Sequence, residues 1–351
     1  MKTSDFDYEL PKELIAQFPA SRREESRLIV LDRAGGDLRE TRFVNFPRYL
    51  VAGDVLVVNE TRVIPARLFG HKRSGALIEI FLVRRLANRH WIAMIRPSKR
   101  VGVGEIVFIG EHGHELLVEG RVSPGEWRVS LPPGLEERDF IERHGHVPLP
   151  PYIKRSDVSD DRERYQTVYA QRDGSVAAPT AGLHFTEEIL LDLKRRGITI
   201  VPVTLHVGPG TFRPLANETV EENALEPEHV LVKRAHWDLI AAARRSGRRL
   251  VSVGTTTTRT IEAFASGRVS AREEHEIDGE AYISGTTDLF IYPGYQFSAV
   301  DAILTNLHLP RSSLLLLVSA FAGRETILMT YRWAVDRKFR FYSYGDAMFI
   351  R

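Results

Sequence analysis

The stretch from Gly174 to Leu215 constrains the fold of this chain more than any other, because it reads as a strand, a loop, a helix and a second strand. Thr186 is suited to cap a helix that begins with two glutamates, and Gly197 follows a basic last turn that is typical of a helix end. The run Ile198–Leu205 is apolar and rich in β-branched residues, which is the composition of a strand covered on both faces by helices. We therefore predict a βαβ unit here.

Histidines follow three strand-like runs, each directly after a leucine. They are His184 in GLHF, His206 in LHVGPGTF and His308 after AILTN. Open α/β folds bind ligands at the carboxyl edge of the sheet, so we expect the three histidine loops to meet there and form a site. For any single histidine, a neutral imidazole that only caps a loop is an equally good interpretation.

Two further loops are suited to contact a ligand. Small residues between Ala177 and Gly182 let a ligand approach the backbone closely. The threonines Thr255–Thr258 follow the strand-like run RLVSVG at a helix start, where hydroxyls and unpaired amides favour an anion such as a carboxylate or phosphate. Ordinary helix capping needs only one of these threonines, so the signal is moderately specific.

The composition indicates a soluble protein of about two domains. The chain has 351 residues, of which 43% are hydrophobic and 27% charged, and its formal net charge is +2. There is no cysteine, which excludes disulfides, thiolate metal sites and a cysteine nucleophile. The amino terminus does not resemble a signal peptide, and the longest apolar run, Leu314–Ala322, is about half of the ~20 residues that span a bilayer. We expect a cytoplasmic monomer that does not enter the membrane.

A change in hydrophobic period divides the chain. From Ala66 to about Pro132, short alternating runs follow one another between glycines, prolines and serines, which predicts a compact all-β module, a small barrel. The predicted fold class is thus α/β, a mixed or parallel sheet with flanking helices plus an inserted small β-barrel. We place the barrel at residues 65–150 and a discontinuous α/β catalytic domain at residues 1–64 and 151–351.

Several local elements are predicted from shorter signals. Pro11 marks a helix start, the run from Asp288 to Gly294 reads as a strand, and Ser312 or Ser313 caps a helix that is apolar all round. The polar residues 59–62, at the end of the buried strand VLVVN, could form a turn or part of a site, and a turn is the default.

A basic turn lies within the barrel sequence. Arg96, Lys99 and Arg100 could contact a phosphate backbone, although exposed loop charge is the preferred interpretation. No glycine-rich dinucleotide signature follows a strand and opens a helix, which disfavours a nicotinamide cofactor.

Long motifs along the whole chain carry a family resemblance. FDYELPKELIAQFP, NETRVIPARL, PLPPYIKR, AAPTAGLHFTEE, TLHVGPGTF, VGTTTTRTIE, GTTDLFIYPGY, TNLHLPRSSLLLLVSAFAGRE and FRFYSYGDAMFI follow one another in this order. Together they resemble the S-adenosylmethionine:tRNA ribosyltransferase-isomerases of queuosine biosynthesis. Several of the motifs exceed eight residues, so the resemblance is far more specific than a single short pattern.

The resemblance implies both a fold and a reaction. The fold is an α/β domain that carries an inserted β-barrel. The reaction transfers the ribosyl part of S-adenosylmethionine to 7-aminomethyl-7-deazaguanine at the wobble position of tRNA and isomerises it, so that epoxyqueuosine-tRNA forms and adenine and methionine leave. S-adenosylmethionine is then a consumed ribosyl donor, tRNA is the partner, and no cofactor is bound permanently.

The implied chemistry needs a base, an acid and placement, because the aminomethyl group of the substrate is itself the nucleophile. His184 or His206 is the expected base, and the other or His308 protonates the departing adenine. Thr255, Thr256 and Arg259 are expected to hold the donor carboxylate and Asp346 its ammonium. A role for Arg259 in bracing the helix against the sheet is an equally good interpretation. Asn306 and Arg311 are expected to read the deazaguanine or a phosphate. The full predicted substrate-binding set is Thr180, Gly182, Gly210, Thr211, Thr255, Thr256, Arg259, Asn306, Arg311 and Asp346.

Two other functions remain open on the sequence. In one, His184, His206 and His308 ligate a divalent ion in a metalloenzyme, although paired ligand spacing such as HExxH is absent and we expect no metal. In the other, the chain is a noncatalytic tRNA-binding protein built on the barrel.

Overall fold

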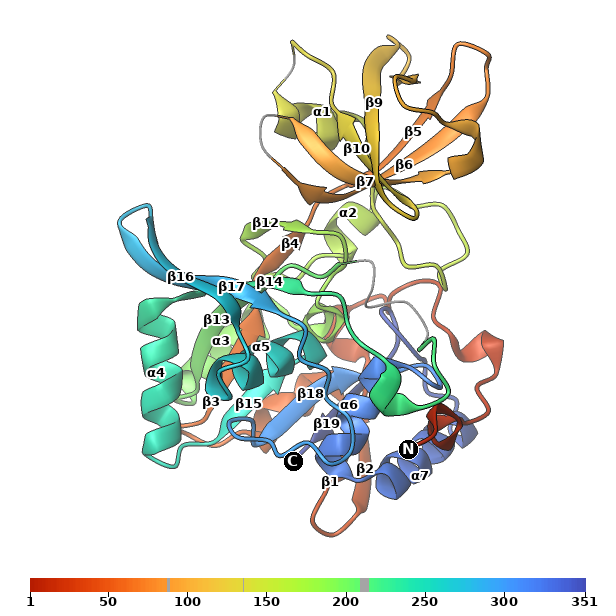
Figure 1. The fold of residues 1–351 in the computed structure, drawn as a ribbon. Helices are drawn as coiled ribbons and strands as arrows, with labels where there is room; N and C mark the ends of the chain where they lie inside the picture. Colours follow the sequence, from red (N-terminus) through yellow and green to blue (C-terminus); the bar gives the residue numbers. More distant parts are fainter. Residues whose placement is uncertain (87–88, 135, 209–214) are drawn as a thin grey trace.

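The computed structural model describes residues 1–86, 89–134, 136–208 and 215–351 of the chain. It consists of an α/β part and a β-barrel that stands at one end of it (Figure 1). The fold class predicted from the sequence is confirmed.

A ten-stranded sheet forms the centre of the α/β part. Four neighbouring strands in its middle, β13, β3, β15 and β18, run parallel to one another. The strands outside this block pair mainly antiparallel, apart from the parallel pair β1 and β19. In spatial order the strands are β16 (Ser270–Ile277), β17 (Glu280–Thr287), β14 (Glu228–Lys233), β13 (Thr199–Leu205), β3 (Val55–Asn59), β15 (Leu250–Val253), β18 (Ala302–Asn306), β19 (Ala347–Ile350), β1 (Arg27–Asp32) and β2 (Asp37–Arg42).

Helices cover both faces of this sheet, as the apolar composition of its strands requires. Val55 and Val57 of β3 point to one face, which packs against four helices; Leu56 and Val58 point to the other, which packs against one helix and a 3-10 segment. The first set comprises α4 (Arg234–Arg245), α5 (Thr255–Ala265), α6 (Ser313–Ala322) and α7 (Arg324–Asp336), and the second α3 (Glu187–Arg195) and η4 (Phe43–Tyr49).

The barrel consists of six antiparallel strands, β5 to β10. It is closed by the pairing of β5 with β8, the first and fourth of these strands along the chain. Alternate side chains point inward and form a separate hydrophobic core, which explains the period-two pattern of the sequence. The barrel elements are β5 (Arg67–His71), β6 (Leu77–Arg85), β7 (His90–Arg96), η5 (Ser98–Arg100), β8 (Ile106–Ile109), β9 (His114–Ser123), β10 (Glu126–Ser130), α1 (Glu137–His144) and β11 (Gly145–His146). The exact domain boundaries at residues 64/65 and 150/151 stay a prediction.

The local predictions for α3 and α6 are confirmed. The Thr186 hydroxyl accepts a hydrogen bond from the Ile189 N–H at 3.3 Å, and α3 is followed by Gly197 with a φ of 79°. The Ser312 hydroxyl caps α6 by accepting from the Leu315 N–H at 3.2 Å, and most side chains of α6 are buried.

Three local predictions are wrong. The strand before α3, β12 (Arg172–Ser175), pairs with β4 (Thr61–Val63) in a separate two-stranded sheet, so α3 does not join two strands of one sheet. Residues 288–294 are not a strand, because the hairpin β16–β17 precedes them and supplies the edge pairing of the sheet. The helix expected after Pro11 is only a 3-10 turn, η2 (Lys12–Leu14).

Within the described ranges, no single helix is both long and apolar enough to cross a membrane. The helices α6 and α7 meet that test only when taken together, and they are bent by 116° relative to each other.

We predict that Gly145→Ala strongly destabilises the fold. A Cβ at position 145 would lie 1.9 Å from the Pro65 carbonyl oxygen and 2.4 Å from that of Ile141, and neither backbone atom can move freely. Overpacking of this kind should lower the free energy of unfolding by about 3 kcal/mol in urea denaturation. Gly120→Ala is the matched control, since nothing lies within 4 Å of the added atom and a change under about 1 kcal/mol is expected. Equal effects of the two substitutions would contradict the prediction.

Candidate active site

The four parallel strands end at the same edge of the sheet and deliver polar side chains there. Strand β3 ends at Asn59, β13 is followed by His206, and β18 ends at Asn306, two residues before His308. The helix α5 begins directly after β15, at Thr255. The strand order confirms that the loops of His206 and His308 share the carboxyl edge. The same prediction for His184 is wrong in its basis, because the strand before it, β12, belongs to the separate two-stranded sheet.

Asn59 joins three of the loops at this edge. Its side-chain amide donates to the Leu205 carbonyl at 3.0 Å and to the Thr256 hydroxyl at 3.4 Å. Its side-chain oxygen accepts from the N–H groups of Thr61 and Leu205, both at 3.1 Å. The sequence favoured a turn for residues 59–62 over part of a site, whereas the buried Asn59 holds the loop of His206 against the start of α5.

A small cavity of about 50 Å³ lies between the ends of β15 and β18. Five predicted site residues line it: Thr180, Thr255, Thr256, Asn306 and His308. The Thr180 hydroxyl donates to the Asn306 side-chain oxygen at 3.0 Å, which ties the 3-10 segment η6 (Thr180–His184) to the end of β18. The cavity is far too small for a nucleoside, since ligand pockets usually measure roughly 300–1,000 Å³.

His308 is buried in the wall of this cavity. A hydrogen bond of 2.8 Å joins its Nε2 to the Thr305 hydroxyl, and its carbonyl accepts from the Tyr8 hydroxyl. Burial lowers the pKa of His308 to about 3, so the imidazole is neutral near neutral pH.

His184 contacts Asn306 but does not line the small cavity, nor does it line the larger cavity that is described next. Hydrogen bonds join its Nδ1 to the Ser26 hydroxyl at 2.9 Å and its Nε2 to the Asn306 side-chain nitrogen at 3.2 Å. Its ring packs against Phe43, and burial lowers its pKa to about 3, with Arg340 and Arg23 acting in the same direction. Both ring nitrogens are thus occupied within the protein.

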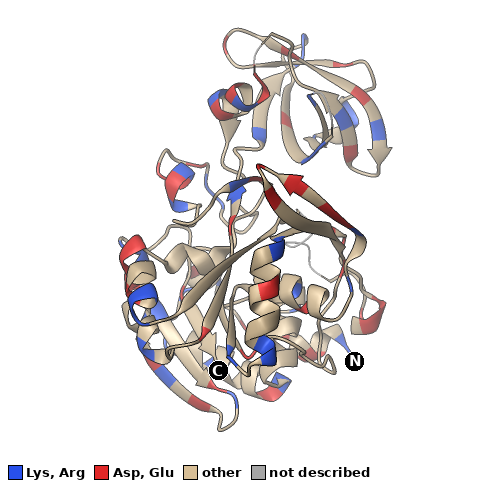
Figure 2. Cartoon of the chain, turned by 90° about the vertical axis from the view of Figure 1, so that its left-hand side faces the viewer, with Lys and Arg blue, Asp and Glu red and all other residues tan. Residues whose placement is uncertain are grey.

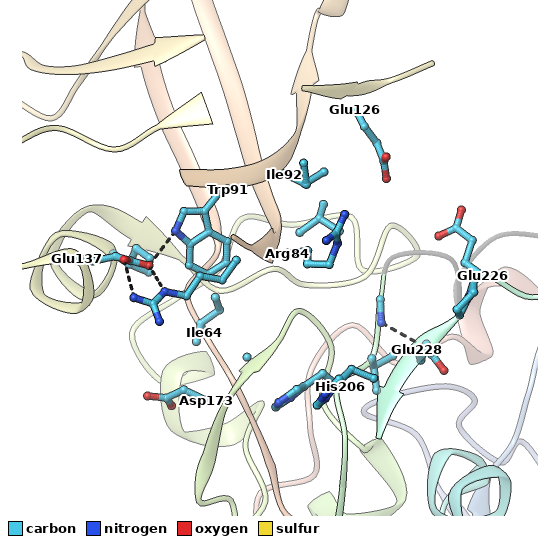
Figure 3. A pocket seen from close by; sticks show the side chains of 18 of the residues that line it. Ile64, Arg84, Trp91, Ile92, Glu126, Glu137, Asp173, His206, Glu226 and Glu228 are labelled. Carbon is cyan, nitrogen blue, oxygen red and sulfur yellow. Dashed lines mark hydrogen bonds and ion pairs between the residues drawn. The ribbon is translucent and has the colours of Figure 1, made fainter. Parts of the chain in front are cut away.

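A much larger cavity of about 970 Å³ lies between the barrel and the carboxyl edge, and we call it the interdomain cleft. Figure 3 shows Arg84 and Ile92 of the barrel on one side, with His206 and Glu228 of the α/β part on the other. Val207 lines both the cleft and the small cavity, so the two spaces are neighbours. The volume of the cleft is sufficient for a nucleoside ligand.

His206 is the only one of the three predicted catalytic histidines that lines the cleft. A hydrogen bond of 2.8 Å joins its Nδ1 to the Thr61 hydroxyl, and none of the residues that the structure describes bonds to its Nε2. The ring of His229 lies parallel to it at a centroid distance of 6.0 Å. Burial lowers the pKa of His206 to about 4, and His229 and Arg172 contribute in the same direction.

The guanidinium of Arg259 also lines the cleft, where it forms an ion pair with Glu228. The Glu228 carboxylate also accepts from the Gly208 N–H at 3.2 Å. Sequence reasoning missed Glu228, because its place beside Arg259 depends on the pairing of β14 with β13 and β17, which no local pattern reveals.

Three predicted binding residues lie outside both cavities. The buried Asp346 accepts from the N–H groups of Arg27 at 3.0 Å and Arg340 at 2.8 Å, and burial raises its pKa. Arg311 pairs with Asp7 on the surface. Gly182 packs against Tyr169, whose hydroxyl leaves no room for a side chain. Gly210 and Thr211 lie outside the described residues.

The basic turn of the barrel lies away from the cleft. Arg96, Lys99 and Arg100 are exposed and line neither cavity. The arginines that the barrel presents to the cleft are instead Arg84, Arg85 and Arg138. Arg85 is held by Glu137 at 2.8 Å, which also accepts from the Trp91 side chain at 2.9 Å.

Across the parts of the chain that the structure describes, no three histidine, aspartate or glutamate side chains lie close enough together to hold a metal ion. The three predicted catalytic histidines do not share one cavity: His206 lines the cleft, His308 lines the small cavity, and His184 lines neither. The described residues therefore give the metalloenzyme alternative no ligand set.

Comparisons with known proteins give a consistent result. A family model described as "Queuosine biosynthesis protein" matches residues 3–350. The chain is 49% identical to a protein of Geobacter metallireducens, with 100% of both chains covered, and 50% identical to one of Moorella thermoacetica, also with 100% of both covered. Both relatives are named S-adenosylmethionine:tRNA ribosyltransferase-isomerase.

A solved structure supports the same relationship. It is a crystal structure of S-adenosylmethionine tRNA ribosyltransferase from Thermotoga maritima, which is 37% identical in sequence. The comparison covers 99% of this chain and 100% of the other, with a TM-score of 0.54.

We predict that the buried His184 makes the fold less stable in mild acid. Its pKa of about 3 lies below the ~6.5 of an unfolded histidine, so the unfolded chain takes up a proton below pH ~6.5 that the folded protein does not. Stability is therefore lost as the pH falls, by about 2 kcal/mol for this residue between pH 7 and 5. Urea denaturation at both pH values should show a loss larger in wild type than in His184→Gln by that amount. An identical loss in both proteins would contradict the neutral buried state.

Proposed function

The chain belongs to the queuosine biosynthesis protein family, and we propose from this premise that it transfers and isomerises the ribosyl part of S-adenosylmethionine onto 7-aminomethyl-7-deazaguanine in tRNA. The amine of the substrate base is the nucleophile, and adenine and methionine are released as the ribosyl part is transferred and isomerised. The product is epoxyqueuosine-tRNA. S-adenosylmethionine is a consumed substrate, and the protein is not proposed to hold a permanent cofactor.

The observation that best supports the proposal is the interdomain cleft, because it combines sufficient volume with an available imidazole at a strand end. Its volume of about 970 Å³ can admit a nucleoside together with an extruded base. Its walls combine apolar side chains such as Trp91 and Ile92 with the charged pair of Glu228 and Arg259. The barrel and the α/β part both contribute, so both are needed for binding.

His206 is the proposed base. The sulfonium of the donor acidifies the C5′ protons, and a neutral imidazole in the cleft can remove one of them and so promote the loss of adenine. Burial lowers the pKa of His206 to about 4, so the imidazole is neutral and able to accept a proton at neutral pH, while this pKa lies below the value of about 7 that we expected of a general base. The hydrogen bond of Nδ1 to Thr61 fixes the ring and leaves Nε2 for the substrate.

The other predicted histidines support the site in different ways. His184 is proposed to position Asn306, because it bonds to the Asn306 side chain and lies outside both cavities. His308 is proposed to shape the small cavity beside Thr255 and Thr256. Because its pKa is about 3, the imidazole of His308 carries no extra proton at neutral pH that it could donate to adenine. We therefore assign it no role as a general acid.

The tRNA is proposed to approach from the barrel side of the cleft. Figure 2 marks acidic residues along the ribbon of the hairpin β16–β17, and Glu273, Glu274 and Glu276 are exposed there, so this hairpin repels phosphates. Arg84 of the barrel lines the cleft, and Arg96, Lys99 and Arg100 are exposed elsewhere on the barrel. These four residues are the proposed phosphate contacts.

The noncatalytic alternative makes a different prediction for the same mixture. A tRNA-binding protein without activity would release no adenine from S-adenosylmethionine when substrate tRNA is present. Release of adenine in proportion to the modified tRNA would establish the transferase.

We predict that His206→Gln lowers the rate of adenine release under single-turnover conditions by at least about 100-fold, since general base catalysis is worth ~10²–10⁴-fold. The affinity for tRNA should change less than about threefold, because the phosphate contacts are unaffected. His275→Gln replaces an exposed histidine on the hairpin β16–β17 and serves as the control. A wild-type rate in His206→Gln would remove this residue from the proposed chemistry.

We predict that tRNA affinity falls steeply with salt, by at least about tenfold between 50 and 200 mM, because phosphate contacts release counterions. Replacing Arg96, Lys99 and Arg100 together by alanine should make the logarithmic salt slope shallower by about 0.7–0.9 per lost contact. Filter binding over a salt series measures both quantities. An unchanged slope in the triple variant would exclude these residues as phosphate contacts, and a flat wild-type slope would oppose phosphate binding altogether.

A further inference from the structure

Glu228 and Arg259 form an ion pair that is almost completely buried at the inner side of the interdomain cleft. Their side chains are 7% and 4% exposed, respectively. Removing two charges from water costs several kcal/mol per ion, and a buried pair is often no more stabilising than apolar residues of similar volume. Stability of the fold is therefore a weak reason for placing these two residues on the wall of a cleft.

Arg259 retains a hydrogen-bond donor for which the described residues supply no acceptor. Arg259 donates to Glu228 through one terminal nitrogen, while its Nε–H is buried and has no hydrogen-bond partner among the residues that the structure describes. A guanidinium offers five N–H donors, and a carboxylate accepts several hydrogen bonds at once. A buried donor without a partner is costly, so a ligand atom that accepts from Arg259 would satisfy it.

We propose that Glu228 and Arg259 together bind the amino-acid end of S-adenosylmethionine, with the α-carboxylate on Arg259 and the α-ammonium on Glu228. The inference rests on the proposed function and adds Glu228 as a specificity-determining residue. Neighbouring charges of opposite sign are complementary to a zwitterion, which carries both of its charges on one carbon. Asp346, which the sequence suggested for the ammonium, is occupied by two backbone N–H groups instead.

The position of His206 supports this orientation of the donor. The Gly208 N–H donates to Glu228, and Gly208 is only two residues beyond His206. The backbone N–H of His206 also donates to the carbonyl of His229, the residue after Glu228. A donor held by its amino-acid end at Glu228 therefore keeps its C5′ carbon, a short methionine chain away, near the proposed base.

The edge of the deazaguanine base offers a competing occupant for the same pair. Its carbonyl oxygen could accept from Arg259 while its ring N–H and amino group donate to Glu228. The base, however, must present its aminomethyl group to the ribose from the opposite side of its ring system. The zwitterion is therefore the occupant that places the reacting C5′ carbon nearer to His206.

The test compares two ligands that differ in the amino-acid end. S-adenosylhomocysteine and 5′-methylthioadenosine are both neutral at sulfur, and only the first carries the carboxylate and the ammonium. Calorimetric titration of the wild-type protein should show a clear preference for S-adenosylhomocysteine. In Glu228→Gln this preference should fall on the order of 10- to 100-fold, whereas the affinity for 5′-methylthioadenosine should stay within about twofold.

Two further variants make the result specific. Glu222→Gln makes the same change of charge at an exposed position six residues away that does not line the cleft, and it should keep the wild-type preference. Arg259→Lys keeps the charge but loses the planar fork, so it should also lower the preference. Thermal unfolding establishes that each variant is folded, and Arg259→Lys carries the test if Glu228→Gln does not fold.

The outcomes separate this inference from the proposed function. An unchanged preference in Glu228→Gln and Arg259→Lys would overturn the inference while leaving the transferase reaction intact. Loss of affinity for the deazaguanine-containing tRNA, with unchanged nucleoside binding, would assign the pair to the base instead and also overturn it. A wild-type protein that binds neither nucleoside and releases no adenine would overturn both proposals.

Discussion

The carboxamide of Asn59 fixes the relative positions of the loops on which the candidate site depends. Its nitrogen and oxygen bond to both backbone groups of Leu205, to the Thr61 N–H and to the Thr256 hydroxyl. Because the side chain is fully buried, water cannot replace a lost partner, and each lost hydrogen bond would leave a buried polar group unsatisfied. The end of β3 therefore dictates where His206 follows β13 and where α5 begins.

The interdomain cleft exists because the barrel is inserted beside this edge of the sheet. The α/β part supplies His206, directly after β13, and Arg259 of α5, and the barrel supplies Trp91 and Arg84 on the opposite wall. Such a division is physically reasonable for a reaction between a small nucleoside and a macromolecule. One part offers rigid strand ends for the small donor, and the other widens the site toward the nucleic acid.

The sequence was informative wherever a local pattern determines the structure. Alternation predicted the barrel, strand ends followed by polar residues predicted that the loops of His206 and His308 lie at one edge of the sheet, and Thr186 and Ser312 predicted two helix starts. Patterns failed where long-range pairing decides. They could not show that β12 joins β4 in a separate sheet, that Glu228 meets Arg259, or that His184 is enclosed while His206 lines the cleft. All three histidines follow a leucine, and only tertiary packing distinguishes them.

The central claim is that the donor binds in the interdomain cleft, against the carboxyl edge of the parallel strands. A crystal structure of the protein with S-adenosylhomocysteine bound tests this claim most directly. The account predicts density for the nucleoside inside the cleft, with its ribose near His206 and its amino-acid end at Arg259. Density on the outer surface of the barrel, or at the opposite edge of the sheet with an empty cleft, would contradict the account.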